Sequence, residues 1–314
     1  MLDWIYVALG LVLLLLAGDS LVRGAVNMSL RVGIPALIVS LTIVAFGTSA
    51  PELLISIQSI YEGVPGLALG NVVGSNTANV LLVLGVPAMF AAMHTSDCDT
   101  KKSYVQMLAA TALFMVICFL GPITWQDGFI LLAALAAMLT WAAFEAKKHR
   151  EAEPDDEEEI EGADPNLGWG KILFFLLLGI IGLPLGADLL VNGSTNIARG
   201  FGVSETVIGL TLVAVGTSLP ELATTMSAAI RRQADVALGN VIGSNMFNLL
   251  GIMGVASLFG TIPVDDEILS FDIWIMLGAS LLLIPFVFFK MDISRIWGVI
   301  LSALYATYIF LVLV

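Results

Sequence analysis

Two glutamates interrupt apolar stretches of the chain, and each directly follows a proline. Glu52 ends the segment GTSAPE and Glu221 ends the segment GTSLPE. An ionisable side chain inside a membrane segment costs roughly 2.5–3.5 kcal/mol on insertion scales, and such a residue usually serves a site. In a helix the threonine four residues earlier shares a face with the glutamate, and a serine adjoins it; these residues are Thr48, Ser49, Thr217 and Ser218. The pattern indicates oxygen ligands for a cation.

A second polar motif also occurs twice, as GNVVGSNTAN and GNVIGSNMFN. Its serine and its last asparagine are four residues apart, so a helix places their oxygens on one face; they are Ser75, Asn79, Ser244 and Asn248. Hydrogen bonding between helices is a competing role for these four residues. We expect the remaining asparagines of the motif to be structural or to support the ligands; they are Asn71, Asn76, Asn240 and Asn245.

All of these candidate ligands are oxygens, because neither His94 nor His149 lies in a motif. Such a set disfavours soft transition metals and suits Ca2+, which takes about six to eight oxygens, and also Na+. Two negative charges are balanced by one Ca2+, by two Na+ or by two protons, so exchange between these ions is electrostatically natural. The competing structural role is a pair of protonated glutamates that only hydrogen-bond across the bundle.

Proline predicts a break in each helix that carries a glutamate. Pro51 and Pro220 lack an N–H donor, and their rings clash with the carbonyls of Gly47 and Gly216. A freed carbonyl in hydrocarbon is costly unless it lines a cavity or binds a ligand. We therefore predict broken helices in the second and seventh spans. We also predict that the third and eighth spans are broken, because the glycines of the second motif permit a kink or close packing there.

The composition excludes a water-soluble globule. Of 314 residues, 58% are hydrophobic and 12% charged, with a mean hydropathy of +0.97, whereas a soluble domain is about half apolar and a quarter charged. A span needs roughly 20 residues, and apolar segments lie at residues 2–22, 34–60, 67–92, 104–120, 123–146, 172–191, 206–230, 236–259, 268–289 and 296–314. The sequence predicts an all-α membrane protein with ten transmembrane helices. We expect the first helix to be retained and not to be a signal peptide, because it has no basic leading region.

The positions of the charges predict the orientation in the membrane. Twelve of the 13 basic residues fall in odd-numbered loops, and only Arg199 falls in an even-numbered one. Basic loops stay cytoplasmic, so we expect a multi-pass cell-membrane protein with both termini extracytoplasmic. The acidic linker at 147–170 is then cytoplasmic, as a solvated tether or a weak Ca2+ sensor. No basic cluster suits nucleic acid, and Cys98 and Cys118 form no metal or disulfide pattern.

The chain repeats itself at an offset of 169 residues. Between residues 47–85 and 216–254, 17 of 39 positions are identical, and the match extends upstream through Asp19 and Asp188. The repeat divides the chain into five-helix halves at 1–146 and 171–314. Because five is odd, the second half enters the membrane from the opposite face, an arrangement typical of secondary transporters. For Asp19 and Asp188 we expect capping or loop contacts near helix ends, or else a gating contact.

The doubled GTSxPE and GNxxGSNxxN segments resemble the two alpha-repeats of the sodium/calcium exchanger family, within the cation/calcium antiporter superfamily, and the short linker resembles its compact prokaryotic members. The resemblance implies exchange of three Na+ for one Ca2+, with the first and sixth helices sliding past the core. It implies a cation site made by Ala45, Thr48, Ser49, Glu52, Ser75, Asn79, Ala214, Thr217, Ser218, Glu221, Ser244 and Asn248, in which the alanines supply carbonyls. Many relatives carry an aspartate where this chain has Asn79 or Asn248, so only two carboxylates remain here.

Two other functions stay open at this point. The same glutamates suit an antiporter that exchanges H+ for Ca2+, and a passive cation channel would need no counter-ion. A membrane enzyme is disfavoured because the motifs contain no nucleophile with a base. We expect no cofactor and no obligatory protein partner, with the lipid bilayer and the transported ions as the only partners.

Overall fold

A computed structural model describes residues 2–152, 164, 167–202 and 214–313, and the elements in this part of the chain are helical. In the labels that follow, α marks an α-helix and η marks a π-helical stretch, except for one η element at Thr95–Asp97, which is a 3-10 turn. The elements are α1 (Leu2–Val32), α2 (Ala36–Val39), η1 (Ser40–Val44), α3 (Ala45–Thr48), α4 (Ala50–Tyr61), α5 (Gly66–Ala78), η2 (Asn79–Val83), α6 (Gly85–Phe90), η3 (Thr95–Asp97), α7 (Lys101–Leu120), α8 (Trp125–Ala152), α9 (Trp169–Gly200), α11 (Ala214–Thr217), α12 (Leu219–Ile230), α13 (Ala234–Met246), η5 (Phe247–Ile252), α14 (Met253–Phe259), η6 (Ile268–Asp272), α15 (Ile273–Leu281), α16 (Ile284–Phe288) and α17 (Arg295–Leu313).

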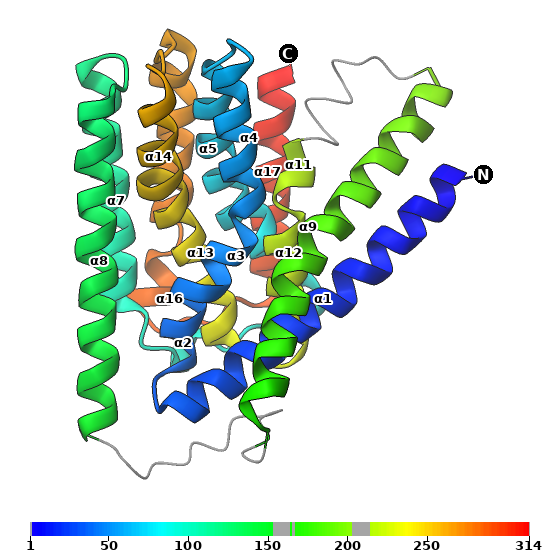
Figure 1. The fold of residues 1–314 in the computed structure, drawn as a ribbon, viewed down its shortest axis with the longest axis vertical. Helices are drawn as coiled ribbons and strands as arrows, with labels where there is room; N and C mark the ends of the chain where they lie inside the picture. Colours follow the sequence, from blue (N-terminus) through cyan, green and yellow to red (C-terminus); the bar gives the residue numbers. More distant parts are fainter. Residues whose placement is uncertain (1, 153–163, 165–166, 203–213, 314) are drawn as a thin grey trace.

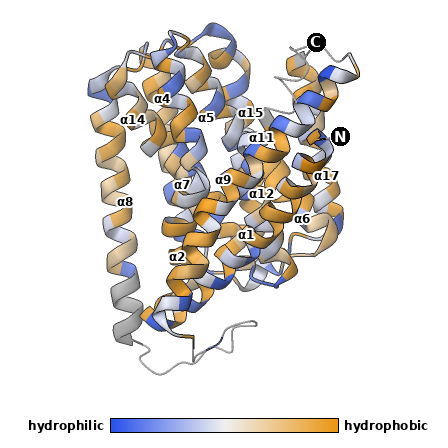
Figure 2. Cartoon of the chain, turned by 45° about the vertical axis from the view of Figure 1, so that its right-hand side comes forward, coloured by the Kyte–Doolittle hydropathy of each residue, from blue (hydrophilic) through white to orange (hydrophobic). Residues whose placement is uncertain are grey.

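Eight helices in the described residues are long and apolar enough to cross a membrane, and a bent pair, Ala36–Thr48 with Ala50–Tyr61, makes a ninth. Apolar residues cover most of their length (Figure 2). The all-α membrane class is therefore confirmed. The seventh predicted span begins in 203–213, outside the described residues, so the count of ten stays a prediction.

Two spans form the centre of the molecule. In both Gly66–Phe90 and Ala234–Phe259, 78% of the residues in an apolar stretch of 18 residues are buried inside the protein. In the corresponding stretch of α8 the share is 11%. These central spans contain the two GNxxGSNxxN motifs, so the polar strips lie inside the protein and not against lipid. Between their flanking α-helices, each has a π-helical stretch, η2 or η5. Such local widening of a helix is frequent at functional sites.

The longest helices, α1 and α9, pack against each other in opposite directions and run obliquely to the rest of the bundle (Figure 1). Glycines allow the contact: a Cβ at Gly179 would lie 2.5 Å from Leu21 Cβ, and one at Gly10 would lie 2.7 Å from the backbone nitrogen of Leu190. At 31 and 32 residues, both helices exceed the roughly 20 that a straight crossing needs. A long span of this kind is accommodated by tilting.

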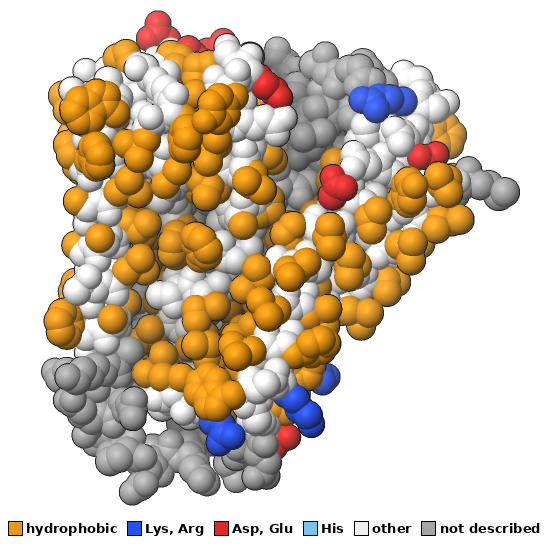
Figure 3. All heavy atoms as spheres, viewed as in Figure 1, with side chains coloured by type: hydrophobic (Ala, Val, Ile, Leu, Met, Phe, Trp, Pro, Cys, Tyr) orange, Lys and Arg blue, Asp and Glu red, His pale blue; other side chains and the backbone are white. Residues whose placement is uncertain are grey.

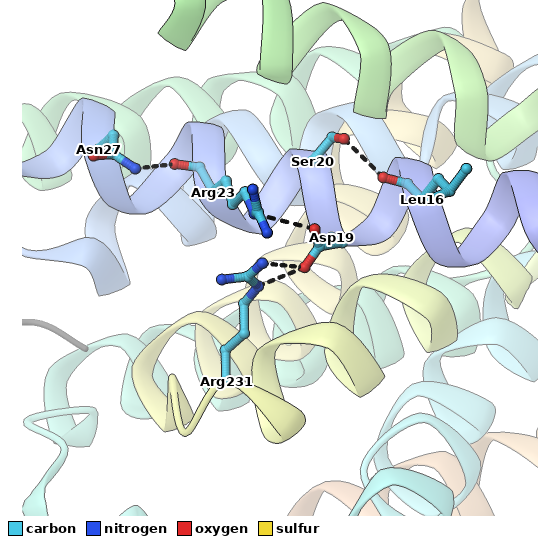
Figure 4. A network of polar contacts seen from close by, with 6 residues as sticks. All are labelled: Leu16, Asp19, Ser20, Arg23, Asn27 and Arg231. Carbon is cyan, nitrogen blue, oxygen red and sulfur yellow. Dashed lines mark hydrogen bonds and ion pairs between the residues drawn. The ribbon is translucent and has the colours of Figure 1, made fainter. Parts of the chain in front are cut away.

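Asp19 lies inside α1 and does not cap its end, so the expected capping role is wrong, whereas the expected loop contact is present, with Arg231 in the turn after α12. The apolar run stops near residue 22, but the helix continues to Val32. Asp19 pairs with Arg23 one turn later at 3.1 Å, and it accepts from Nε of Arg231, at the end of α12, at 2.6 Å (Figure 4). The contact therefore joins α1 to the helix that carries Glu221.

Asp188 is likewise inside its helix, α9. It accepts a hydrogen bond from Asn192 at 2.8 Å, which is a local contact within one face of the helix. The two aspartates occupy equivalent positions in the repeats but make different contacts.

The repeat is visible in the elements. Helices α4 and α12 both have 12 residues, and α5 and α13 both have 13. Two isolated antiparallel bridges, Met93 with Ile293 and Ile262 with Ile123, link the halves reciprocally. The antiparallel course of α1 and α9 is what inversion requires of this pair, and inversion of the complete halves stays a prediction.

On the face shown in Figure 3, hydrophobic side chains predominate, with Lys and Arg at the lower edge apart from one group at the upper right. Helix α8 continues to Ala152, so the first residues of the predicted linker are helical. Most of the acidic stretch, 153–163, lies outside the described residues. The orientation of the termini and of the linker stays a prediction.

Candidate cation site

Both glutamate-bearing spans are interrupted at the serine that precedes the proline. Ser49 and Ser218 separate α3 from α4 and α11 from α12, with backbone angles near φ −85°, ψ 7° and φ −88°, ψ 5°. The first pair bends by 42°. Proline fits the first turn of a helix because its missing N–H needs no partner there. The predicted breaks at Pro51 and Pro220 are therefore confirmed, and each proline lies in the first turn of a new helix.

Each new helix holds its glutamate in its first turn, where the helix dipole favours negative charge. Glu52 and Glu221 are both 1% exposed. The hydroxyl of Ser49 donates to Oε1 of Glu221 at 2.9 Å, although the two residues belong to different repeats. The structure thus brings the two motifs together at one buried place.

Thr48 provides a second link between the repeats. Its hydroxyl lies 3.2 Å from Oδ1 of Asn240 and 3.4 Å from Oγ of Ser244, both on α13. It also lies 3.2 Å from the carbonyl of Ala45, which accepts from the backbone N–H of Ser49 at 3.0 Å. The Ala45 carbonyl therefore accepts hydrogen bonds within its own turn here, whereas the resemblance implies that it faces a cation.

Buried oxygen atoms without a hydrogen-bond partner gather on the predicted ligands. Seven buried side-chain N or O atoms in the described residues lack a partner, and five of them belong to the predicted set: Glu52 Oε2, Glu221 Oε2, Asn79 Oδ1, Asn248 Oδ1 and Ser218 Oγ. Leaving one such group unsatisfied costs about 1–3 kcal/mol, and more for a charged group. A cation is a partner that several oxygens share, so the arrangement suits cation binding.

The other predicted residues lie on the same four spans. Ser75 is buried on α5, and Thr217 is half-buried at the end of α11. The backbone of Ala214 begins α11, but its side chain lies outside the described residues. All twelve predicted positions thus fall on the interrupted second and seventh spans or on the central third and eighth spans.

Two asparagines support the first turns that hold the glutamates. Asn240 donates to the carbonyl of Glu221 at 3.3 Å and to Oγ1 of Thr225 at 3.1 Å. Asn71 makes the equivalent longer contacts, 3.4 Å each, with the carbonyl of Glu52 and with Ser56. The supporting role expected of these asparagines is consistent with this geometry. The hydroxyls of Ser56 and Thr225 were not predicted, although their position four residues after each glutamate could have indicated them.

Ser49→Ala tests the hydroxyl that joins the repeats. A hydrogen bond to a charged group contributes about 1.5–3 kcal/mol, so we expect its loss to raise the Ca2+ concentration for half-maximal uptake about tenfold or more. The measurement is radioactive Ca2+ uptake into proteoliposomes. Ser59→Ala is the matched control, because Ser59 is also buried on α4 but donates to Ile55 of its own helix. Equal behaviour of the two variants would contradict a role for Ser49 in the site.

A comparison with known protein families decides what kind of protein carries this site. The sequence model of the family described as "Sodium/calcium exchanger protein" matches residues 2–144 and 171–314. The chain belongs to the sodium/calcium exchanger family. It is therefore a multi-pass membrane antiporter and not an enzyme.

Individual exchangers match the chain over nearly its whole length. A putative antiporter, CaxA, of Alkalimonas amylolytica is 35% identical over 89% of this chain and 88% of its own. The sodium/calcium exchanger MaX1 of Methanosarcina acetivorans is 32% identical over 98% of this chain and 97% of its own. A solved structure of the sodium-calcium exchanger NCX_Mj, soaked with zero Na+ and Ca2+, superposes with a TM-score of 0.84 at 34% identity, covering 99% of both chains. The compact form of this chain matches these prokaryotic-type family members.

Proposed function

We propose that this chain is an antiporter that moves Ca2+ against Na+ through a single site between its two repeats. The observation that supports this proposal most strongly is that five of the predicted ligands carry a buried oxygen without a hydrogen-bond partner among the described residues, two of them carboxylate oxygens. Family membership and the match to NCX_Mj support the ion pair. The proposed ligands are the twelve residues named above, with Glu52 and Glu221 at their centre.

Electrostatics supports exchange over simple binding. Two carboxylates that share a buried place repel each other, and one Ca2+ or two Na+ neutralises them. Two buried carboxylates without a bound cation are energetically costly. The protein should therefore change its access from one side of the membrane to the other with either Ca2+ or Na+ bound, and not with an empty site. The resemblance to the family leads us to propose a third Na+ beyond the two that neutralise the carboxylates. Exchange of three Na+ for one Ca2+ moves one net charge and adds about 2.3 kcal/mol per 100 mV to the driving force.

Imposed ion gradients across proteoliposomes test the coupling ion. We expect Ca2+ uptake when Na+ is higher inside, no uptake from a K+ gradient, and a membrane potential reported by a voltage dye as Ca2+ enters. Ca2+ uptake driven by a pH gradient in the absence of Na+ would indicate that H+, and not Na+, is the coupling ion. Ca2+ entry down its own gradient without any counter-ion would instead indicate a channel.

We also propose that both termini are extracytoplasmic and that the linker at 147–170 is cytoplasmic. The support is the one-sided distribution of basic residues in the sequence. A protease site inserted into the linker should be cut in inside-out membrane vesicles and protected in right-side-out vesicles. The opposite pattern would invert the topology without affecting the transport site.

A further inference from the structure

Four buried asparagines from the two repeats form one reciprocal network at the centre of the molecule. Asn76 lies on α5 and Asn79 begins η2, while Asn245 lies on α13 and Asn248 is in η5. All four are at most 1% exposed. Each pair in one repeat is offset by 169 from its equivalent in the other, so the network joins like parts of the two halves.

The network begins with two backbone carbonyls. The side-chain amide nitrogen of Asn76 donates to the carbonyl of Asn245 at 3.2 Å, and that of Asn245 faces the carbonyl of Asn76 at 3.5 Å. A carbonyl can only accept, so each of these side chains must present its nitrogen to it. The orientation of both amides is thereby determined, and their oxygens point the other way.

Those oxygens in turn determine the orientation of the other two amides. Asn79 donates to Oδ1 of Asn245 at 3.0 Å, and Asn248 donates to Oδ1 of Asn76 at 2.9 Å. Because each must present its nitrogen to an acceptor, its own oxygen is turned away from the network. These two oxygens, Asn79 Oδ1 and Asn248 Oδ1, are among the partnerless buried atoms of the cation site.

We propose that Asn76 and Asn245 are positioning residues, which hold the amides of Asn248 and Asn79 with their oxygens turned toward the transported cation and so set the affinity for Ca2+. The inference rests on the proposed function and adds two residues outside the twelve proposed ligands. Ligand-orienting partners of this kind typically affect metal affinity 10–100-fold. It also gives a physical reason for asparagine at positions 79 and 248, because an ionised aspartate there cannot donate to the network oxygen that it faces.

A double-mutant cycle in the full chain tests the inference. Asn76→Ala removes the acceptor that orients Asn248, so we expect the half-saturating Ca2+ concentration to rise about tenfold, with a smaller change in maximal rate. Asn248→Ala should have a similar effect. The double variant should be no weaker than Asn248→Ala alone, because Asn76 acts through Asn248. The symmetry-related cycle with Asn245→Ala and Asn79→Ala should behave in the same way.

Thr77→Val is the matched control, since Thr77 is buried beside Asn76 but, among the described residues, its hydroxyl donates only to Val73 of its own helix. The half-saturating Ca2+ concentration of this variant should be unchanged. Normal Ca2+ dependence in Asn76→Ala, or effects of the two single variants that simply multiply in the double, would overturn the inference. If a variant transports too slowly, the Ca2+-induced rise in its melting temperature in detergent replaces the uptake measurement: a smaller rise than in the unmodified chain supports the inference and an equal rise overturns it. Absence of Na+-driven uptake by the unmodified chain would refute the proposed function, and this melting comparison would still judge the positioning role.

Discussion

Glu52→Gln and Glu221→Gln should each reduce Na+-dependent Ca2+ uptake into proteoliposomes to background. Glutamine keeps the size of the side chain and one oxygen but removes the charge. The attraction between one unit charge on a carboxylate and one on a cation about 4 Å away is about 4 kcal/mol at an effective dielectric constant of 20. A loss of this size corresponds to about a thousandfold in affinity, so neither variant should retain Ca2+ at ordinary concentrations.

The control for these variants is Glu62→Gln. Glu62 follows the end of α4, is exposed, and accepts from Gln58. The Glu62→Gln variant therefore removes one negative charge just after the same helix and leaves the proposed ligands unchanged. Near-normal uptake by both Glu52→Gln and Glu221→Gln would refute the site assignment. Loss in the control as well would mean that overall charge, and not these carboxylates, governs uptake.

The parts of this site that could be predicted from sequence are those that depend on local chemistry. Proline at residues 51 and 220 determines where the two helices break, whatever packs around them. The same polar residues recur in the second repeat at an offset of 169 residues, which chance alone does not explain. Carboxylates in apolar sequence indicate a site for the general reason that burial of a charge is costly.

Contacts between helices could not be predicted in this way. Ser49 donates to Glu221, and Thr48 lies beside Asn240, but periodicity describes only which side chains share a face of one helix. Which helices meet depends on packing of the whole bundle. The equivalent contacts also differ between repeats, since Ser218 Oγ has no partner among the described residues while Ser49 Oγ has one.

The ends of the helices could not be predicted from hydropathy either. Apolar runs mark the part of a helix that is suited to lipid, and α1 continues for ten residues beyond the predicted end at residue 22. This is why Asp19 was expected near a helix end and is found within α1, paired with Arg231 of α12.

Gly243→Ala should disrupt the site through the backbone of the second span. A Cβ at Gly243 would lie 2.6 Å from the carbonyl oxygen of Leu41 and 2.7 Å from Cβ of Ala45. Neither neighbour can swing aside, since one is backbone and the other a fixed methyl group. Overpacking of a buried contact costs about 1–3 kcal/mol, and relief by separating the helices would carry the Ala45–Thr48 turn away from Ser244. We expect a lower melting temperature and a fall in Ca2+ uptake of about tenfold or more.

Gly278→Ala provides the contrast that separates close packing from the general effect of replacing a helical glycine. Gly278 lies within α15, and a Cβ there would meet no described atom within 4 Å. Alanine favours a helix over glycine by about 1 kcal/mol, so this variant should be at least as stable as the unmodified chain and should transport normally. Gly243→Ala has the same gain in helix propensity. Any loss of stability or uptake in that variant therefore comes from steric displacement that outweighs this gain. If Gly243→Ala proved as stable and active as Gly278→Ala, the second span would not be held against α13 at this point, and the contact of Thr48 with Asn240 and Ser244 would lose its structural basis.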